Sequence, residues 1–347
     1  LESMFALKQL MVLLDGNFES RTDGTKLPVN SRGGYAGTAC IEDIDEAEHV
    51  LIVGSNPRTE APVLNARLRK AWAQGADIEL VGDPVDLTYD YTHIGRDRKS
   101  LEKTLKRTLN SKLRNKNSLI IVGMGALTGE DGYGVLSLIH RIAEDSNSRI
   151  LMLHTVASRV GAMDIGFVSD HKIQDLMQNS EVIYNLGGDE FDIGDGPFVI
   201  YQGSHGDRGA HRADIILPSA TYTEESGLFV NMEGRVQSAQ RANFAPGEAK
   251  ENWAILRALS NELDKALPYN NLMELRALLF EEFPHLKNIG CIGEKEFSSV
   301  KKSKLDIGPF ENIISDFYLT NPIARSSEVM AELSSIAKSK DMKVAAE

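Results

Sequence analysis

The chain has 347 residues, of which 42% are hydrophobic and 25% charged, a composition that predicts a globular protein of two or three domains. Its formal net charge of -12 at pH 7 disfavours phosphate backbones and anionic membrane surfaces, so we expect no nucleic acid as a partner. The two cysteines, Cys40 and Cys291, lie far apart, which excludes a disulfide framework and any cluster or zinc site built from cysteine alone.

Neither a membrane-spanning segment nor a signal peptide is predicted. No apolar run reaches the length of a membrane span, so we expect no direct membrane insertion. The chain begins with Leu1 inside a helical pattern, and we therefore expect it to be a piece of a longer protein.

Strands and helices alternate in the first half of the chain. Helices are predicted at about residues 2–14, 60–74, 99–114 and 132–144. Buried strands are predicted at residues 49–53, 78–81 and 119–122. The segment from residue 49 to 81 is typical of one strand–helix–strand unit, which implies a parallel pair with a right-handed crossover.

The same alternation continues in the second half. The strand at residues 150–153 is expected to begin a second set of elements. Further strands are predicted at residues 182–184, 198–201 and 214–217, and helices at 173–177 and 253–267. Hydrophobic, β-branched strands that alternate with helices predict an α/β fold with two doubly wound, Rossmann-like parallel-sheet lobes.

Three regions follow from this pattern. The first lobe is expected at residues 31–148, and the second at 149–265, with residues 1–30 packing on it. Residues 266–347 form a helical or irregular C-terminal extension, with helices near 272–282 and 326–339. We expect the last residues of the chain to be frayed or disordered.

A turn that follows the first strand is the best candidate for a nucleotide loop. Gly54 opens this turn, and the next strand ends in an acid, Asp83, as a ribose-binding site requires. The loop has one glycine where phosphate cradles use two or three. The structural alternative is a strand-to-helix turn in which Asn56 caps the helix and Pro57 opens it.

A second glycine-rich turn lies at residues 123–129, between a strand and a helix. Glycines there would let a pyrophosphate approach the backbone at a helix N-terminus. The strand that follows ends in His154 and Thr155 instead of an acid. This favours a tight structural turn.

Other candidate groups lie in the second half. Residues 187–190, with two glycines and two acids, follow a predicted strand at the edge where open α/β sheets bind ligands. His205, Asp207 and His211 form a local cluster, but their spacing matches no standard metal site and favours loop residues at a lobe interface. The turn at 187–190 also has a simpler interpretation, as a turn with two solvated acids.

Charged residues elsewhere carry weaker signals. Glu224, Glu225 and Glu233 are candidate acid or base groups, but no nucleophile or histidine is placed beside them by a motif. A basic stretch lacks interleaved aromatic residues and predicts a solvated or partner-facing patch. Its members are Lys99, Lys103, Lys106, Arg107, Lys112, Arg114 and Lys116.

Two segments resemble the molybdopterin oxidoreductase superfamily. In residues 213–237 an apolar strand ends at Pro218 and an Asn-x-Glu-Gly-Arg loop begins at Asn231, and residues 54–76 contain a Gly-Ser-Asn-Pro turn. The resemblance implies two lobes of that family's type with a crevice that holds a pterin dinucleotide. The corresponding positions in this chain are Gly54, Asn56, Pro57, Asp83, Gly187, Asp189 and Glu190.

Longer segments resemble the large iron–sulfur subunits of respiratory complex I, the NADH:quinone oxidoreductase. These are residues 61–67, 83–89, 201–207 and 316–327. The resemblance implies the C-terminal region of a subunit that carries electrons from NADH toward quinone, whose [2Fe-2S] and [4Fe-4S] clusters lie in an absent N-terminal part. It also implies partners among the other peripheral-arm subunits, including the NADH- and flavin-binding side. The place implied is the peripheral arm on the inner membrane, facing the mitochondrial matrix or the bacterial cytoplasm.

The chain departs from active molybdenum enzymes in the loop at about residues 20–37. That loop supplies a metal ligand in the active enzymes, and here it offers only Ser20, Asp23 and Ser31 as candidates. The complex I relatives are regarded as having kept the fold and dropped the cofactor. We therefore expect no catalytic residue, no metal and no bound cofactor in this chain, a vestigial crevice, and a role as a structural scaffold for the cluster-bearing domains.

Two other functions remain open. An active molybdopterin oxidoreductase fragment, similar to formate dehydrogenase, would bind a pterin dinucleotide across Asn56, Asp83 and residues 187–190. A nucleotide-binding module would use residues 54–83 or 123–129, and NAD(P) or a guanine nucleotide would raise its melting temperature.

Overall fold

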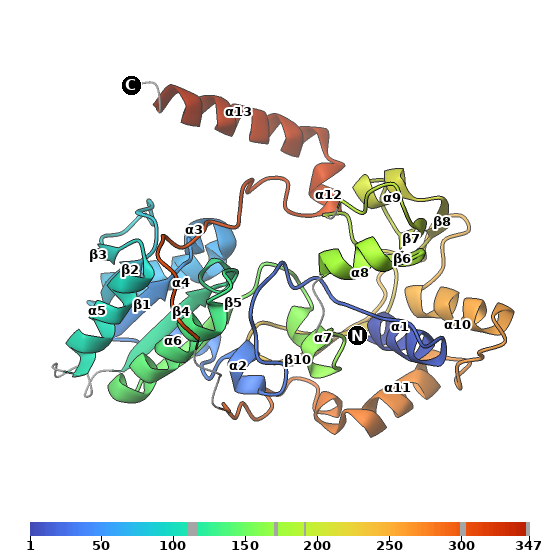
Figure 1. The fold of residues 1–347 in the computed structure, drawn as a ribbon, viewed down its shortest axis with the longest axis horizontal. Helices are drawn as coiled ribbons and strands as arrows, with labels where there is room; N and C mark the ends of the chain where they lie inside the picture. Colours follow the sequence, from blue (N-terminus) through green and yellow to red (C-terminus); the bar gives the residue numbers. More distant parts are fainter. Residues whose placement is uncertain (110–116, 170–172, 191, 299–302, 345–347) are drawn as a thin grey trace.

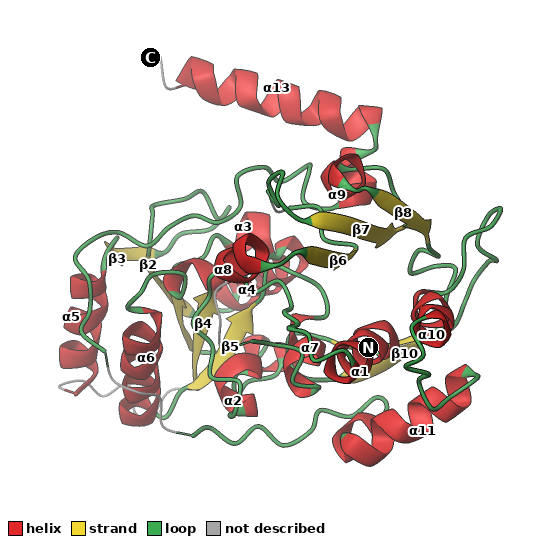
Figure 2. Ribbon diagram, turned by 45° about the vertical axis from the view of Figure 1, so that its right-hand side comes forward, coloured by secondary structure: helices red, strands yellow, loops and turns green. Residues whose placement is uncertain are grey.

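The computed structural model describes residues 1–109, 117–169, 173–190, 192–298 and 303–344. Its strands form two parallel sheets and one hairpin, with helices around them (Figure 1, Figure 2). No helix among the described residues combines the length and the apolar character that crossing a membrane requires.

The larger sheet has five parallel strands in the order β3-β2-β1-β4-β5. They are β1 (His49–Val53), β2 (Asp77–Val81), β3 (Thr92–Gly95), β4 (Ser118–Gly123) and β5 (Arg149–Leu153). The helices that connect them are α3 (Pro57–Glu60), α4 (Pro62–Ala73), α5 (Arg98–Leu109) and α6 (Gly132–Ser146). Every residue of β1 and β4 is buried, because helices or other segments cover both faces of the sheet.

Strand β5 corrects one expectation from the sequence. The strand expected to begin the second set of elements pairs instead with β4, with Ile150 opposite Ile120. Both strands are apolar and β-branched, so their composition does not reveal which sheet they join. The ranges of the two lobes remain a prediction, and this pairing favours a boundary beyond residue 153.

The smaller sheet has three parallel strands, β6 (Val182–Leu186), β7 (Phe198–Gly203) and β8 (Ile215–Pro218). A hairpin follows, formed by β9 (Gly227–Val230) and β10 (Val236–Ala239). The predicted Asn-x-Glu-Gly-Arg loop joins these two strands, and the N–H of Asn231 donates to the carbonyl of Arg235 at 3.0 Å. The flanking strands were not predicted from the sequence.

The remaining helices surround the second half of the molecule. They are α1 (Glu2–Leu13), α2 (Arg32–Ala36), α7 (Arg159–Asp164), α8 (Ile173–Asn179), α9 (Arg208–Arg212), α10 (Asn252–Glu262), α11 (Leu272–Glu282), α12 (Pro322–Arg325) and α13 (Glu328–Val344). Short 3-10 turns lie at Ile41–Ile44, Met124–Ala126 and Pro284–Lys287. Helix α1 packs on α10 and α11. The end expected to be frayed is helical as far as Val344, which corrects that expectation.

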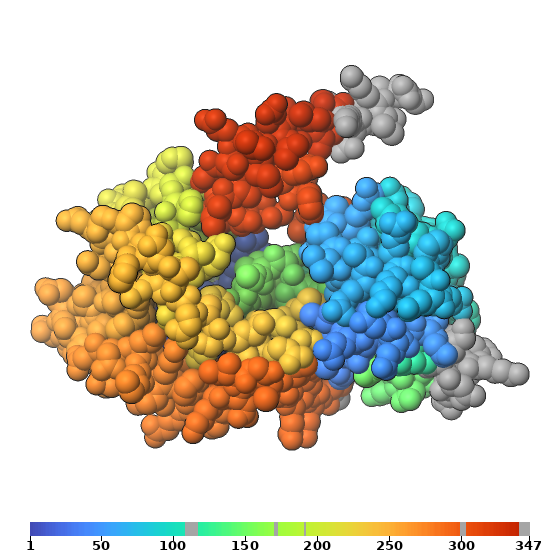
Figure 3. All heavy atoms as spheres, turned by 180° about the vertical axis from the view of Figure 1, so that it is seen from behind, coloured from blue at the N-terminus to red at the C-terminus, as the bar shows by residue number. Residues whose placement is uncertain are grey.

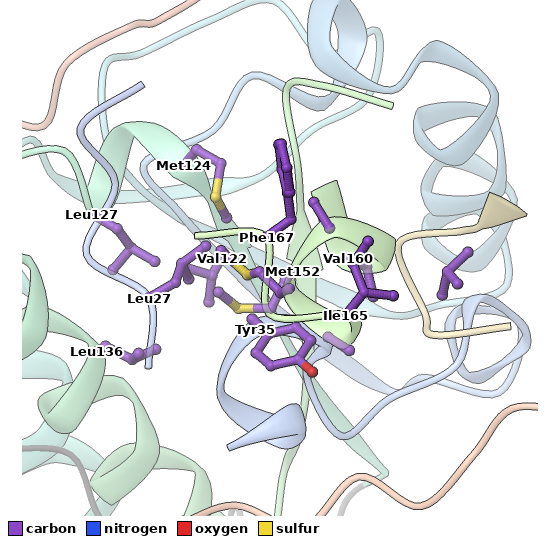
Figure 4. Packing of buried hydrophobic residues seen from close by; sticks show 14 of the residues in the cluster. Leu27, Tyr35, Val122, Met124, Leu127, Leu136, Met152, Val160, Ile165 and Phe167 are labelled. Carbon is purple, nitrogen blue, oxygen red and sulfur yellow. The ribbon is translucent and has the colours of Figure 1, made fainter. Parts of the chain in front are cut away.

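One face of the larger sheet shares its core with the second half of the chain. The apolar cluster runs from Val122 and Met152 on the sheet, through Val160 and Ile165 around α7, to residues of β9, α10 and α11 (Figure 4). A separate cluster, which includes Ile52 and residues of α4, covers the other face. The shared core ties the two sheets together through the segments between them.

The C-terminal extension crosses both halves of the molecule. After α11 the chain returns to the larger sheet, and residues 303–313 lie beside it. The chain then crosses to α12 near the smaller sheet, and α13 projects from the body (Figure 1). Seen from behind, the extension passes above a hollow between the two halves (Figure 3).

Candidate functional site

The carboxyl edge of the larger sheet is the first half of the candidate site. The strand order reverses between β1 and β4, and ligands of open α/β sheets bind at such a switch point. Gly54 follows β1 there with φ +57, and a Cβ on it would lie 2.7 Å from the Cβ of Ala126. Both the backbone conformation and the close approach therefore require glycine.

The turn after Gly54 has the capping geometry considered as the structural alternative. The Asn56 side chain accepts a hydrogen bond from the N–H of Arg58 at 3.2 Å, and Pro57 occupies the first turn of α3. The Glu60 carboxylate accepts from the N–H of Asn56 at 2.7 Å. These contacts confirm the capping interpretation and explain the Asn-Pro sequence without a nucleotide.

Asp83 lies at the end of the second strand, as the sequence predicted. Its carboxylate forms an ion pair with Arg96, with Oδ1 2.6 Å from Nε and 2.5 Å from Nη2. The acid at the position expected to bind a ribose is thus already paired with a guanidinium of the same chain.

The first crevice is filled by the C-terminal extension. The space among Gly54, Asn56 and Asp83 has a volume of about 20 Å³ and is closed by residues 310–312. A Cβ on Gly125, at the second glycine turn, would lie 2.1 Å from the carbonyl oxygen of Glu311. Ligand pockets span about 300–1,000 Å³, so this space holds about one water molecule and no dinucleotide.

The electrostatics of this crevice are also unfavourable for a phosphate. Burial raises the pKa of Glu60, and the hydrogen bonds from Asn56 and Ser55 only partly oppose that shift. A carboxyl in this position repels an anion only in its charged form. The volume therefore carries the argument that the residues present do not fit a pterin dinucleotide at this edge.

The second half of the site lies at the carboxyl edge of the smaller sheet. Asp189 is 1% exposed and accepts hydrogen bonds from the N–H of Gly209 at 3.2 Å and the hydroxyl of Tyr201 at 3.3 Å. Burial raises the pKa of Asp189 above its ordinary value despite these bonds. Glu190 forms ion pairs with Arg21 and with Arg325 of α12, both at 3.0 Å.

Two cavities adjoin this second edge. One, of about 820 Å³, is lined by Gly187, Asp189 and the ends of β6 and β7, and α12 contributes to its wall. The other, of about 620 Å³, lies beside α1, α7, α8 and β6 and is lined by Gly187 and Glu190. Neither contains Gly54, Asn56, Pro57 or Asp83, so the two sets of predicted crevice residues line separate spaces.

The histidine cluster does not form a metal site. The Asp207 carboxylate binds the guanidinium of Arg325, and a ring nitrogen of His205 lies 2.9 Å from the Ser204 hydroxyl. Across the described ranges, no three His, Cys, Asp or Glu residues are grouped so that they could hold a metal ion. Of the two cysteines, Cys40 is half-buried, Cys291 is exposed, and both are free thiols.

The three candidate ligands of the 20–37 loop occupy different environments. Asp23 forms an ion pair with the buried Arg159 at 2.8 Å. Ser31 donates to the carbonyl of Glu296 at 3.2 Å. The Ser20 hydroxyl is buried without a hydrogen-bond partner beside the 620 Å³ cavity.

The other charged candidates bind backbone or side-chain groups of the chain itself. Glu224 accepts from the N–H of Thr221, Glu225 from that of Asn252, and Glu233 from that of Ile41. In the basic stretch, the four residues of α5 are exposed, and Arg107 pairs with Glu79. Lys112, Arg114 and Lys116 lie outside the described residues.

Sequence reasoning missed the residues that hold the C-terminal extension in place. Arg98 and Asp131 contact it at the first edge, and Arg325 docks it at the second. Arg325 lies in a segment that carried the family resemblance, but no local pattern links it to Asp207, 118 residues away. The partners are brought together only by the fold.

Comparisons with known proteins agree with this architecture. A model of the molybdopterin oxidoreductase family matches residues 1–262, and a model of the C-terminal part of an NADH-ubiquinone oxidoreductase subunit matches residues 291–333. A chain of the formyltransferase/hydrolase complex from Methylorubrum extorquens shares the fold, with a TM-score of 0.55 at 15% identity over 76% of this chain and 88% of that one.

Relatives of known identity extend the match over nearly the whole chain. The mitochondrial 78 kDa subunit of NADH-ubiquinone oxidoreductase from Candida albicans is 39% identical over 99% of this chain and 51% of its own length. The 75 kDa subunit from Reclinomonas americana is 36% identical, covering 97% of this chain and 52% of its own length. A bacterial relative, a subunit of the NADH-quinone oxidoreductase of Rickettsia bellii, is 38% identical, covering 95% of this chain and 50% of its own length.

The chain spans about half the length of these curated relatives. The match to the first family model covers most of the chain, and the second model matches within the C-terminal extension. The chain therefore belongs to the molybdopterin oxidoreductase family and, within it, to the branch that contains the 75 and 78 kDa subunits of the NADH-quinone oxidoreductases.

Proposed function

We propose that this chain is a structural lobe of an NADH-quinone oxidoreductase, the enzyme that passes electrons from NADH to quinone. The lobe binds no molybdenum, no pterin and no other cofactor, and it contributes no reacting group. Its role is to hold the cluster-bearing part of the subunit and the neighbouring subunits in a fixed arrangement. The [2Fe-2S] and [4Fe-4S] clusters belong to the rest of the subunit, as the family resemblance implies.

One observation carries this proposal. The switch point of the larger sheet, where a relative with a cofactor would bind a nucleotide, is filled by residues 310–312 of the same chain. The acids that lie nearest, Glu60 and Asp83, cap a helix turn and pair with Arg96. The volume that residues 310–312 leave, about 20 Å³, is too small for a dinucleotide.

The same arrangement supports a scaffold role. The apolar core continues from the larger sheet into α1, α10 and α11, and close-packed interiors resist deformation. A lobe of this kind keeps the parts attached to it at constant distances. Constant distances are what electron transfer between fixed redox centres requires.

The proposed partners are other peripheral-arm subunits, including those on the NADH- and flavin-binding side. The smaller sheet exposes apolar side chains, among them Val182 at 58%, Phe198 at 44% and Ile216 at 53%. Exposed apolar side chains that gather on one sheet are typical of a protein–protein contact. We propose that the lobe lies in the peripheral arm, facing the mitochondrial matrix or the bacterial cytoplasm, as the family resemblance implies.

Substitutions in the first crevice of the intact enzyme test the proposal. Asn56→Ala and Asp83→Asn remove the polar groups that a bound nucleotide would contact. We expect NADH:quinone turnover per assembled complex to stay within about twofold of wild type, because in a scaffold lobe neither side chain contacts a ligand or a reacting group. Loss of turnover in complexes that assemble normally would contradict the scaffold role.

A further inference from the structure

A buried ion pair near the carboxyl edge of the larger sheet contacts residues 306–309 of the C-terminal extension. Arg98, the first residue of α5, binds Asp131, the N-cap residue of α6, with both Nε–Oδ2 and Nη2–Oδ1 distances at 3.0 Å. The side chains are 10% and 1% exposed. Burial alone raises the pKa of Asp131, but the hydrogen bonds from Arg98 and from the N–H of Asp306 lower it below its usual value. The carboxyl of Asp131 is therefore charged at neutral pH.

The C-terminal extension binds this pair through its backbone. The Nη1 group of Arg98 donates to the carbonyls of Gly308 at 3.2 Å and Pro309 at 2.5 Å. The N–H of Asp306 donates to Asp131 Oδ2 at 3.0 Å. Together these bonds join the ion pair to three peptide groups of the extension.

One side chain and one further peptide group complete the contact. The Phe310 ring is 3% exposed and lies 4.7 Å from the Arg98 guanidinium carbon, a cation–π geometry. The N–H of Phe310 donates to the carbonyl of Arg96 at 3.0 Å, and Pro309 forms an isolated antiparallel β-bridge with Asp97. By contrast, the side chain of Ile307 is 88% exposed, so it points away from the crevice.

Glycines on the sheet side allow this close approach. A Cβ on Gly125 would lie 2.1 Å from the carbonyl oxygen of Glu311, and a Cβ on Gly134 would lie 2.6 Å from the Ser303 hydroxyl. Neither glycine has a positive φ, so its own backbone accepts alanine. The absence of side chains at these positions makes room for the backbone of residues 303–311.

We propose that the carboxyl edge of the larger sheet is a peptide-binding groove, specific for a segment with an aromatic residue at the position of Phe310, and that residues 303–312 occupy it as a resident ligand in cis. The ion pair forms hydrogen bonds with the carbonyls of Gly308 and Pro309 and with the N–H of Asp306. The Phe310 ring covers the guanidinium of Arg98. This deepens the proposed scaffold function, because the bound segment joins the extension to the larger sheet at the place where a nucleotide would lie.

Hydrogen exchange on the intact chain tests whether the segment is bound. In the wild type we expect the amides of Asp306 and Phe310 to be protected. Gly125→Ala places a methyl group against the Glu311 carbonyl, and we expect it to raise the exchange rates of these two amides at least about tenfold. Gly196→Ala is the matched control, since a Cβ there meets nothing within 4 Å.

The amide of Ile121 in β4 reports whether the sheet survives these substitutions. We expect its exchange to be unchanged in Gly125→Ala. Free exchange of the Asp306 and Phe310 amides in the wild type would overturn the proposal, and so would equal exchange rates in Gly125→Ala and Gly196→Ala.

Binding in trans tests the specificity of the groove. Phe310→Ala weakens the resident segment without altering the groove, so a fluorescent peptide of residues 303–313 should bind this variant at least about tenfold more tightly than the wild type, whose groove is occupied. The double variant Gly125→Ala/Phe310→Ala should not bind it. A peptide that carries the Phe310→Ala change itself should bind the single variant more weakly. Equal binding to all three proteins, or no binding to Phe310→Ala, would refute the inference.

The two proposals fail separately. A chain that keeps the segment bound but contains a molybdenum cofactor would contradict only the proposed function. A cofactor-free chain whose Asp306 and Phe310 amides exchange freely would contradict only the peptide groove.

Discussion

The carboxyl edges of the two parallel sheets are filled differently. At the larger sheet, residues 310–312 leave a space of about 20 Å³, whereas a cavity of about 820 Å³ remains at the smaller sheet. The extension reaches both edges. At the first edge its backbone accepts a hydrogen bond from Arg98, and at the second the Arg325 side chain forms an ion pair with Glu190. The carboxyl edge of a parallel sheet can thus be filled or left open, depending on how one later segment docks.

The strands that lead to these edges differ in how far their side chains are exposed. All residues of β4 are buried, whereas Ile215 and Ile216 of β8 are 45% and 53% exposed. Both strands have apolar, β-branched sequences. The five-stranded sheet is covered on both faces, and the three-stranded sheet leaves apolar surface for contact with other subunits, as we propose.

The ion pairs at the two edges allow the sharpest comparison. Arg98→Ala leaves the Asp131 carboxylate buried without its partner, and we expect a loss of about 3–5 kcal/mol in the free energy of unfolding. Arg325→Ala removes ion pairs to Asp207 and Glu190 whose side chains are partly exposed, and we expect a loss of about 1 kcal/mol. Urea denaturation of both variants measures the difference. Equal losses would show that the two edges are held with equal strength.

The strands provide a second comparison. Ile121→Ala in β4 removes a side chain with no exposed surface, and we expect it to cost about 2–5 kcal/mol in the free energy of unfolding. Ile216→Ala in β8 should cost less than about 1 kcal/mol in the isolated chain, because this side chain is half-exposed. Denaturation curves of the isolated variants test this. A large loss in Ile216→Ala would mean that β8 is packed as tightly as β4.

The buried carboxyl of Glu19, beside the 620 Å³ cavity, predicts a dependence of stability on pH. Burial raises the pKa of Glu19 from 4.5 to about 7, although hydrogen bonding to Ser169 and the charge of Arg159 oppose the shift. Between these two pKa values the native state binds more protons than the unfolded state, so this group makes stability fall as the pH rises from 4.5 through about 7. Glu19→Gln removes the ionisation and retains an oxygen that accepts from Ser169.

We therefore expect the melting temperature of Glu19→Gln to exceed that of the wild type by a margin that grows between about pH 5 and pH 8. Thermal melts across this range, with Glu46→Gln at an exposed site as a control, measure the margin. A constant margin would show that Glu19 is ionised normally in the native state.

Local features of this molecule were predictable from sequence, and the long-range ones were not. The pattern at residues 49–81 gave the strand–helix–strand unit, and Asn56 and Pro57 marked the start of α3. Strand β5 was assigned to the wrong set because apolar composition does not encode which neighbour a strand pairs with. The groove was missed because Arg98 contacts Pro309 across 211 residues of sequence, and the segment around Phe310 has neither helical nor strand periodicity.

Molybdenum and pterin content measure the central claim most directly. The chain is purified from cells supplied with molybdate, and metal analysis is combined with extraction and fluorescence detection of oxidised pterin. If the crevices are vestigial and the first is filled by residues 303–312, the molybdenum content and the pterin content should both be far below one equivalent per chain. Stoichiometric molybdenum with a matching amount of pterin would contradict the account.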